Sequence, residues 1–221
     1  MNWPFRLLVL LLMAALPLAA VRAGETVERV VLVVNGHPIL LSELEAALQR
    51  EALLAAKPVA TGEDERHAVL ERMVDQEMLR EEMERSTFQH ASASDVDQKV
   101  QELRKTFPEA ESEAGWNAVL ARYGVRPEEL RSAIAFELDT LRLIDLRLRP
   151  AAQPDQGSIE EYYRGTYLSS VHKAGTKPQP LNRVRDTIKE LLIQQKLADL
   201  TSGWLQSLRV QADIGWVVEK P

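Results

Sequence analysis

The chain has 221 residues, no cysteine, and a formal charge of −6 from 27 basic and 33 acidic residues. The acidic balance argues against nucleic acid and anionic membrane surfaces as partners. The absence of cysteine excludes disulfides, thiol catalysis, thiolate metal sites and CxxC redox chemistry.

The first 23 residues are typical of a signal peptide. Arg6 precedes an uncharged apolar run from Leu7 to Leu18, and Val21-Arg22-Ala23 places small residues at positions −3 and −1 of a cleavage site, with Ala20 as a second cleavage point. The apolar core is shorter than the ~20 residues that a membrane-spanning helix needs. We therefore expect cleavage, export and no stable membrane insertion afterwards. The mature charge would be near −8, because Arg6 and Arg22 are removed.

A β-hairpin that leads directly into a helix is predicted for Val30–Leu48. Asn35-Gly36 lies between two apolar runs, which is the strongest short-range hairpin signal, because both turn residues tolerate positive φ. Ser42 with Glu45 three residues later matches the capping-box pattern of a helix start. We expect this helix to end near Ala56.

The middle of the chain is predicted to be helical almost throughout. Thr61 is the expected cap of the second helix, and Ser94 is expected to open the third, which stops before Pro108. Ser112 and Gly124 have the residue types of a cap and a left-handed end for the fourth helix. Pro127 is expected at the first position of the fifth helix. The apolar stripe of that helix is Leu130, Ile134, Leu138, Leu141, Ile144 and Leu148.

The C-terminal third contains a breaker-rich stretch, a long helix and a last strand. After Pro150–Gly157, Ser158 with Glu161 predicts a short helix to about Tyr167, and residues 168–180 are polar and rich in turn residues. A long helix over Asn182–Val210 would span about 43 Å. Ala212–Val218 has a strand pattern. Since a two-stranded hairpin is marginal in water, we expect this strand to pair with it.

Four segments, taken in order, resemble one known family: VVLVVNGHPILLSELE, VLERMVDQEMLREEMER, IEEYYRGTY and LNRVRDTIKELLIQQKLADLTSGWLQSLRVQADIGWV. That family is the SurA family of periplasmic chaperones. The resemblance implies a mainly α fold, a multi-helix chaperone core with a small β-hairpin completed by a C-terminal strand. The expected divisions are a signal peptide (1–23), an N-terminal helical region (24–167), a linker (168–180), and the long C-terminal helix with its strand (181–221), which packs on the N-terminal region.

Members of this family usually carry one or two parvulin prolyl-isomerase domains where residues 168–180 stand here. Such a domain needs about 90–100 residues. His172 is the only histidine in that stretch, so no paired-histidine site is present in it. The isomerase activity is therefore not expected here.

The resemblance implies a periplasmic, ATP-independent holdase that binds unfolded or extended polypeptides, outer-membrane proteins in particular, without enzyme activity or cofactor. An envelope scaffold or accessory subunit with one dedicated partner is an open alternative, and so is a degenerate prolyl isomerase. A long C-terminal helix on a short tether could also swap between protomers and form a homodimer.

The sequence contains few patterns typical of catalytic or metal-binding sites. His37, His67, His90 and His172 stand in no metal-ligand spacing, and no nucleotide-binding or hydrolase motif is present. The acidic cluster from Glu71 to Glu82 is typical of a solvated helix face.

Eight residues are candidates for peptide binding, because methionine and aromatic side chains suit adaptable apolar contacts. For the methionines and the first three aromatic residues, packing in the core is the competing interpretation. Tyr162 and Tyr163 are adjacent, so at least one should be exposed. The candidates are Met73, Met78, Met83, Trp116, Tyr123, Phe136, Tyr162 and Tyr163.

Overall fold

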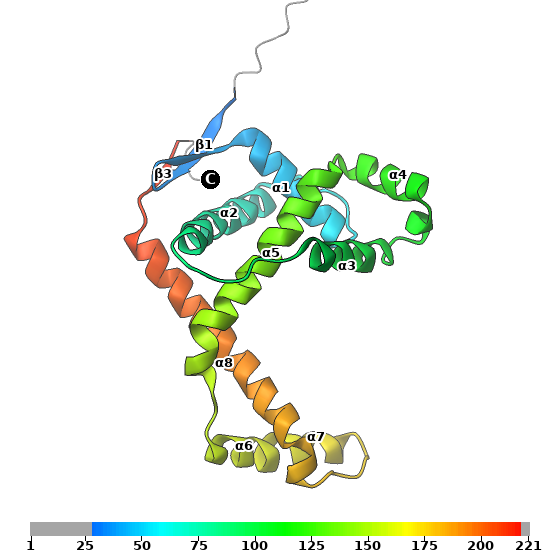
Figure 1. The fold of residues 1–221 in the computed structure, drawn as a ribbon, viewed down its shortest axis with the longest axis vertical. Coiled ribbons are helices and arrows are strands. Elements are labelled where there is room, and N and C mark those ends of the chain that lie inside the picture. The colour runs from blue at the N-terminus through cyan, green and yellow to red at the C-terminus, as the bar shows by residue number, and fades with distance from the viewer. Residues whose placement is uncertain (1–27, 218–221) are drawn as a thin grey trace, which may run out of the picture.

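The computed structural model describes residues 28–217 (Figure 1). The expected signal peptide, residues 1–23, lies outside the described residues, and so does Val218 at the end of the expected strand. The described chain is mainly α, with a small antiparallel sheet, as predicted. Figure 1 shows α1–α4 and the sheet in an upper body, from which α5 and α8 cross on their way to α6 and α7 at the lower end.

The hairpin forms as predicted. β1 (Val30–Val34) and β2 (His37–Leu40) pair antiparallel through a two-residue turn. Asn35 and Gly36 have φ angles of 49° and 86°, the left-handed conformation that this turn needs at both positions.

The C-terminal strand pairs with the hairpin, which confirms the predicted meeting of the two ends of the described chain. β3 (Ile214–Trp216) lies antiparallel to β1, with Leu32 opposite Trp216. The strand order is β2-β1-β3, so β1 is central. Leu32 is consequently buried completely.

α1 (Leu41–Leu54) follows β2 without a break. The predicted capping box at Ser42 is wrong, because the Ser42 hydroxyl donates a hydrogen bond to the Glu28 carboxylate (2.8 Å) instead. The Glu43 carboxylate satisfies the helix start by accepting from the backbone N–H of Leu40 (2.8 Å). A strand that turns directly into a helix leaves its last residue, here Leu40, in the cap position.

Two further helix starts differ from prediction by one or two residues. α2 (Glu63–Glu84) has Gly62 rather than Thr61 at its N-cap. α3 (Ala93–Arg104) is capped by Ser92 rather than opened by Ser94. The Ser92 hydroxyl accepts from the Asp95 N–H (3.2 Å), and the Asp95 carboxylate accepts from the Ser92 N–H (2.8 Å), so two orphan donors are satisfied at once.

The predicted ends of α4 and the start of α5 are confirmed. A 3₁₀ turn (Pro108–Glu111) leads to α4 (Glu113–Tyr123), which Ser112 caps. Gly124 ends that helix with a φ of 70°. α5 (Pro127–Leu148) has its proline at the first helical position, where no N–H is needed.

The lower end is more helical than predicted. After a 3₁₀ turn (Arg149–Ala152), α6 (Gln156–Tyr162) is capped by Asp155, whose carboxylate accepts from the Ser158 N–H (2.7 Å). Ser158 is therefore not the cap. A π-helical turn (Tyr163–Tyr167) continues into α7 (Leu168–Lys173), so within the predicted linker (168–180) irregular backbone is confined to residues 174–180. α8 (Leu181–Gln211) matches the predicted long helix within one residue at each end.

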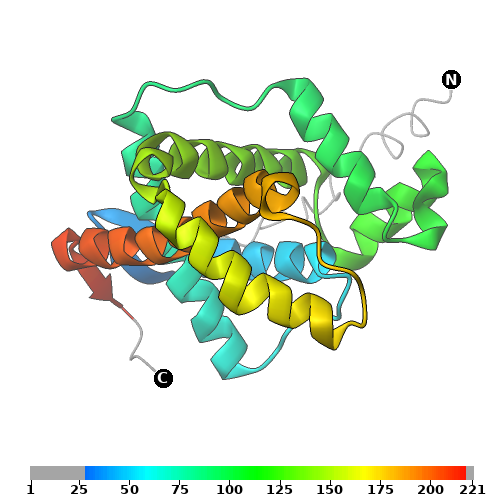
Figure 2. The same cartoon turned by 90° about the horizontal axis from the view of Figure 1, so that it is seen from below.

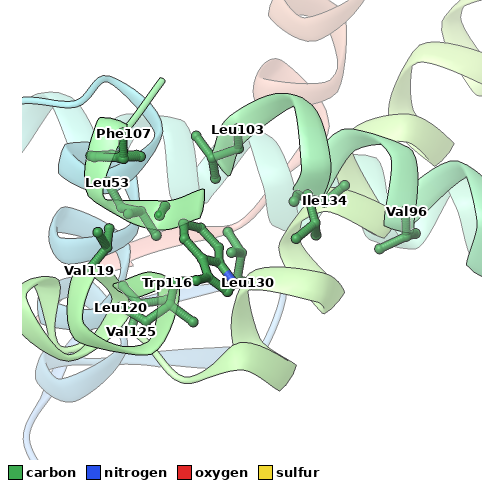
Figure 3. Close-up of a cluster of buried hydrophobic side chains, with 12 residues drawn as sticks. Leu53, Val96, Leu103, Phe107, Trp116, Val119, Leu120, Val125, Leu130 and Ile134 are labelled. Atoms are coloured by element: carbon green, nitrogen blue, oxygen red, sulfur yellow. The ribbon is translucent and has the colours of Figure 1, made fainter. Parts of the chain in front are cut away.

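Three buried clusters hold the described residues together. One surrounds Trp116 between α3, α4 and α5 (Figure 3). A second lies under the sheet, between α1 and α2, and takes half-buried Leu208 and Trp216 from the C-terminal end. The third is much smaller and joins Ala152 to Ile193 and Leu197 of α8. α8 therefore packs at both ends of the molecule.

Candidate functional site

A groove of about 980 Å³ lies between α5, α8 and residues 85–92, the α2–α3 segment. Figure 2 shows this segment running along one side of α5, with α8 close to α5 on the other. We refer to this feature as the groove. Its apolar lining consists of Phe88, Leu138, Leu141, Ile144, Leu146, Leu197 and Ala198.

Two leucines of α5 make the groove unusual as a surface. Leu141 and Leu146 have 55% and 56% of their surface exposed, although both are large apolar side chains. Isolated exposed leucines are common, but here they share one concave site with five other apolar residues. Apolar side chains gathered in one concave site are typical of ligand-binding surfaces, so the groove is the candidate site.

Hydrogen bonds to α5 fix the α2–α3 segment that forms one wall. The Asp139 carboxylate accepts from the Ala91 N–H (2.6 Å), and its other oxygen lies 2.7 Å from His90 Nδ1. The Arg142 guanidinium donates to the carbonyls of Gln89 (3.1 Å) and His90 (2.5 Å). These contacts supply hydrogen-bond partners for backbone groups that have none within the irregular segment itself.

The ionised side chains in the groove already have partners. Besides the carbonyls, Arg142 donates to Asp95 (2.9 Å), and Asp145 accepts from Arg149. The remaining polar lining is neutral: Thr87, Gln89, Gln194 and Thr201. The groove therefore offers apolar contact and neutral hydrogen-bonding groups, and no uncompensated charge that would select a charged ligand.

Ion pairs hold α8, the opposite wall, at two points along its length. Arg149 at the end of α5 donates two hydrogen bonds to the Glu190 carboxylate, both of 3.1 Å. Near the C-terminal end, Arg209 donates to Asp75 (2.6 Å) and Glu71 of α2. The hydrogen bonds that Arg209 donates to Asp75 and Glu71 raise the pKa of Arg209 above its usual value, since they favour the charged form.

None of the eight sequence-predicted residues lines the groove. Met78, Met83 and Trp116 are buried, so in this conformation their side chains offer little surface to a client. Met73 is half-buried and lines a separate, smaller pocket. Their contact with clients stays a prediction.

The other four candidates are half-buried, and three of them make ring contacts. Tyr123 packs edge-on against Phe107, with ring centroids 6.1 Å apart, and Phe136 lies under the Arg80 guanidinium. Tyr162 and Tyr163 both keep part of their surface exposed. Tyr163 also stacks on Tyr167 and donates a hydrogen bond to the Gln179 carbonyl (2.8 Å), so it holds residues 174–180 in place at the lower end of the molecule.

Sequence reasoning placed Leu138, Leu141 and Ile144 on the core stripe of α5 and did not identify Phe88 or Leu146 as site residues. One signal was available. The apolar residues of this helix, with Leu143 and Leu146 included, cover more of its circumference than one buried face needs. In the C-terminal half of α5 the fold buries Leu143, while Leu141 and Leu146 remain exposed in the groove.

Metal-binding groups and membrane-spanning helices are both absent from the described residues. Between residues 28 and 217, no three histidine or acidic side chains are grouped so that they could hold a metal ion. No helix in the same range is long and apolar enough to cross a membrane.

Comparison with known proteins places the chain in a family. A family model described as the SurA-like N-terminal domain matches residues 2–143. A relative named Chaperone SurA, from Chromobacterium violaceum, is 34% identical over 167 residues, which cover 70% of this chain and 37% of the relative. The chain thus spans well under half the length of that relative. Because the family model matches more than half of the chain, the protein belongs to the family with a SurA-like N-terminal domain.

Proposed function

We propose that this protein is a periplasmic, ATP-independent chaperone that holds unfolded polypeptides, outer-membrane proteins among them, in the groove between α5, α8 and the α2–α3 segment. The observation that carries the proposal is the pair of half-exposed leucines, Leu141 and Leu146, inside one groove whose charges are already compensated. The family membership and the chaperone name of the C. violaceum relative support it.

Weak apolar contacts explain how such a site works without ATP. Full burial of a leucine side chain contributes about 1.5–3 kcal/mol, so covering the exposed half of Leu141 or Leu146 contributes about 1 kcal/mol. A client segment that covers several such residues is bound, but it can also leave spontaneously. While bound, its unpaired strand edges and apolar side chains are kept from other unfolded chains.

The proposal does not include prolyl isomerisation. Residues 174–180 are the irregular stretch between α7 and α8, and seven residues cannot contain a domain. The function proposed for this chain is binding alone.

The test is suppression of aggregation of an urea-unfolded outer-membrane β-barrel protein, measured by light scattering after dilution. We expect the unaltered protein to suppress scattering near an equimolar ratio. The double variant Leu141→Ser/Leu146→Ser should need several-fold more protein for the same suppression. The matched control is Leu54→Ser, which changes an exposed leucine of α1 outside the groove and should act like the unaltered protein.

The proposal is wrong if the unaltered protein fails to suppress scattering at several-fold excess. The groove assignment is wrong if the double variant and the control suppress scattering equally well. Circular dichroism of all three proteins shows whether a variant has unfolded or has lost only its binding surface. Both leucines are half-exposed, so their replacement should leave the helical signal unchanged.

A further inference from the structure

A second pocket lies between β2, α1, α2 and the start of α5, and shares no residue with the groove. Its volume is about 260 Å³, which is below the ~300–1,000 Å³ of sites for drug-sized ligands. It is large enough for only one or two amino-acid residues. Its lining combines apolar and charged residues. The apolar ones include Pro38, Ile39 and Met73, and the charged ones are Arg50, Arg80, Glu43, Glu77 and Glu129.

Arg50 is the feature of this pocket that calls for a ligand. Its side chain is half-buried, and among residues 28–217 no atom forms a hydrogen bond or an ion pair with its guanidinium. Burial lowers the pKa of Arg50 below its usual value, and the fields of Glu129 and Glu51 offset only part of that effect. A cation that has lost water without gaining a partner is costly for a protein to keep.

The carboxylates near Arg50 are engaged elsewhere. Glu51 accepts from Arg72 (2.9 Å), and Glu129 accepts from the side chain of Arg126 and from its backbone N–H (3.2 Å). Of the other acidic residues in the lining, Glu77 pairs with Arg80, and Glu43 caps the start of α1. The acidic side chains around the pocket therefore have their own donors, and Arg50 is left over.

We propose that this pocket binds a carboxylate group of a polypeptide, with Arg50 as its partner. A guanidinium presents parallel N–H donors that match the two oxygens of a carboxylate, and a carboxylate would supply the missing charge. Pro38 and Met73 would contact the neighbouring side chain of the ligand. The carboxylate can be the C-terminus of the polypeptide or an aspartate or glutamate side chain. This inference rests on the proposed binding of polypeptides but uses different residues.

The experiment compares three fluorescein-labelled heptapeptides of alternating alanine and leucine by fluorescence anisotropy. The first has a free C-terminal carboxylate, the second is the C-terminal amide, and the third is the amide with one internal glutamate. We expect the free acid to bind the unaltered protein about tenfold more tightly than the amide, the effect of one charge-assisted contact. A similar gain for the third peptide would identify side-chain carboxylates as ligands as well.

Two variants test the role of Arg50. Arg50→Gln should bind all three peptides with the affinity of the amide. Arg50→Lys should keep part of the preference for carboxylates, because the positive charge remains but the parallel N–H donors of the guanidinium are lost. Arg183→Gln is the matched control, since it removes one exposed arginine of α8 and should keep the full preference.

The inference is overturned if the unaltered protein binds the three peptides equally, if it binds none of them, or if Arg50→Gln keeps the preference. The first comparison needs no variant, so a folding defect cannot obscure it. If the three peptides bind with equal affinity, and that affinity falls in Leu141→Ser/Leu146→Ser, the peptides bind in the groove and the inference about the Arg50 pocket is wrong. A preference for carboxylates without any suppression of aggregation would keep the pocket and discard the proposed function.

Discussion

Replacing Ile193 by alanine should loosen the lower end of the molecule and leave the upper body folded. Ile193 is 2% exposed and belongs to the smallest of the three buried clusters, with Ala152 and Leu197. Isoleucine-to-alanine changes in cores cost about 2–5 kcal/mol. Half-buried Ile144, Leu148 and Leu200 complete the site and can relax toward the space left behind, so we expect about 2–3 kcal/mol.

Hydrogen exchange measured by mass spectrometry resolves where that free energy is lost. A tenfold change corresponds to 1.4 kcal/mol, so amides of α6, α7 and the first half of α8 should exchange on the order of a hundredfold faster. Amides of α1, α3 and β1 should keep their rates. The matched control is Leu130→Ala, which removes a side chain of equal burial from the cluster around Trp116 and should accelerate exchange in the upper body.

The result that refutes this reasoning is a uniform acceleration across all helices in Ile193→Ala. It would mean that the chain opens only as a whole and that the small cluster is not a separate unit. An unchanged rate in α8 would also refute it, because the cluster would then contribute nothing to holding that helix.

Two further predictions concern the C-terminal helix and prolyl isomerisation. Arg209→Gln removes the contacts with Asp75 and Glu71. Because these ion pairs are partly exposed to solvent, the free energy of unfolding in urea should fall by only about 1 kcal/mol, with faster hydrogen exchange at β3. A fall above 3 kcal/mol would contradict the argument that solvent weakens these ion pairs. An alanine-proline peptide should isomerise in the presence of the protein at its uncatalysed rate, over tens of seconds at 25 °C, and any acceleration proportional to protein concentration would contradict the proposal.

The parts of the fold that follow local rules could be predicted from the sequence. Asn35-Gly36 between two apolar runs fixes a hairpin, and Gly124 and Pro127 fix the end of one helix and the start of the next. The exact N-cap residues were harder to predict, because several serines and acidic residues within a few positions could each cap the helix. Ser92 prevails over Ser94 because Asp95 returns its hydrogen bond.

The groove could not be predicted in the same way. Periodicity shows that α5 has an apolar face, but the part of it that stays open depends on where α8 crosses, and α8 lies far along the chain. The α2–α3 segment has no periodic pattern, and its position depends on Asp139 and Arg142 of α5. The Arg50 pocket could not be predicted either. Arg50 lacks a partner because the neighbouring carboxylates bind other residues, and residue spacing does not show these pairings.

α8 couples the stability of the molecule to the occupancy of the groove. Its C-terminal end packs under the sheet through Leu208, and its middle supplies both the small cluster and one wall of the groove through Leu197. A client bound in the groove as proposed would therefore cover the surface of the smallest cluster. A ligand at 100 times its dissociation constant stabilises the state that it binds by about 2.7 kcal/mol. That is as much as we expect Ile193→Ala to remove, so a client at such a concentration should restore slow exchange in α8 of that variant.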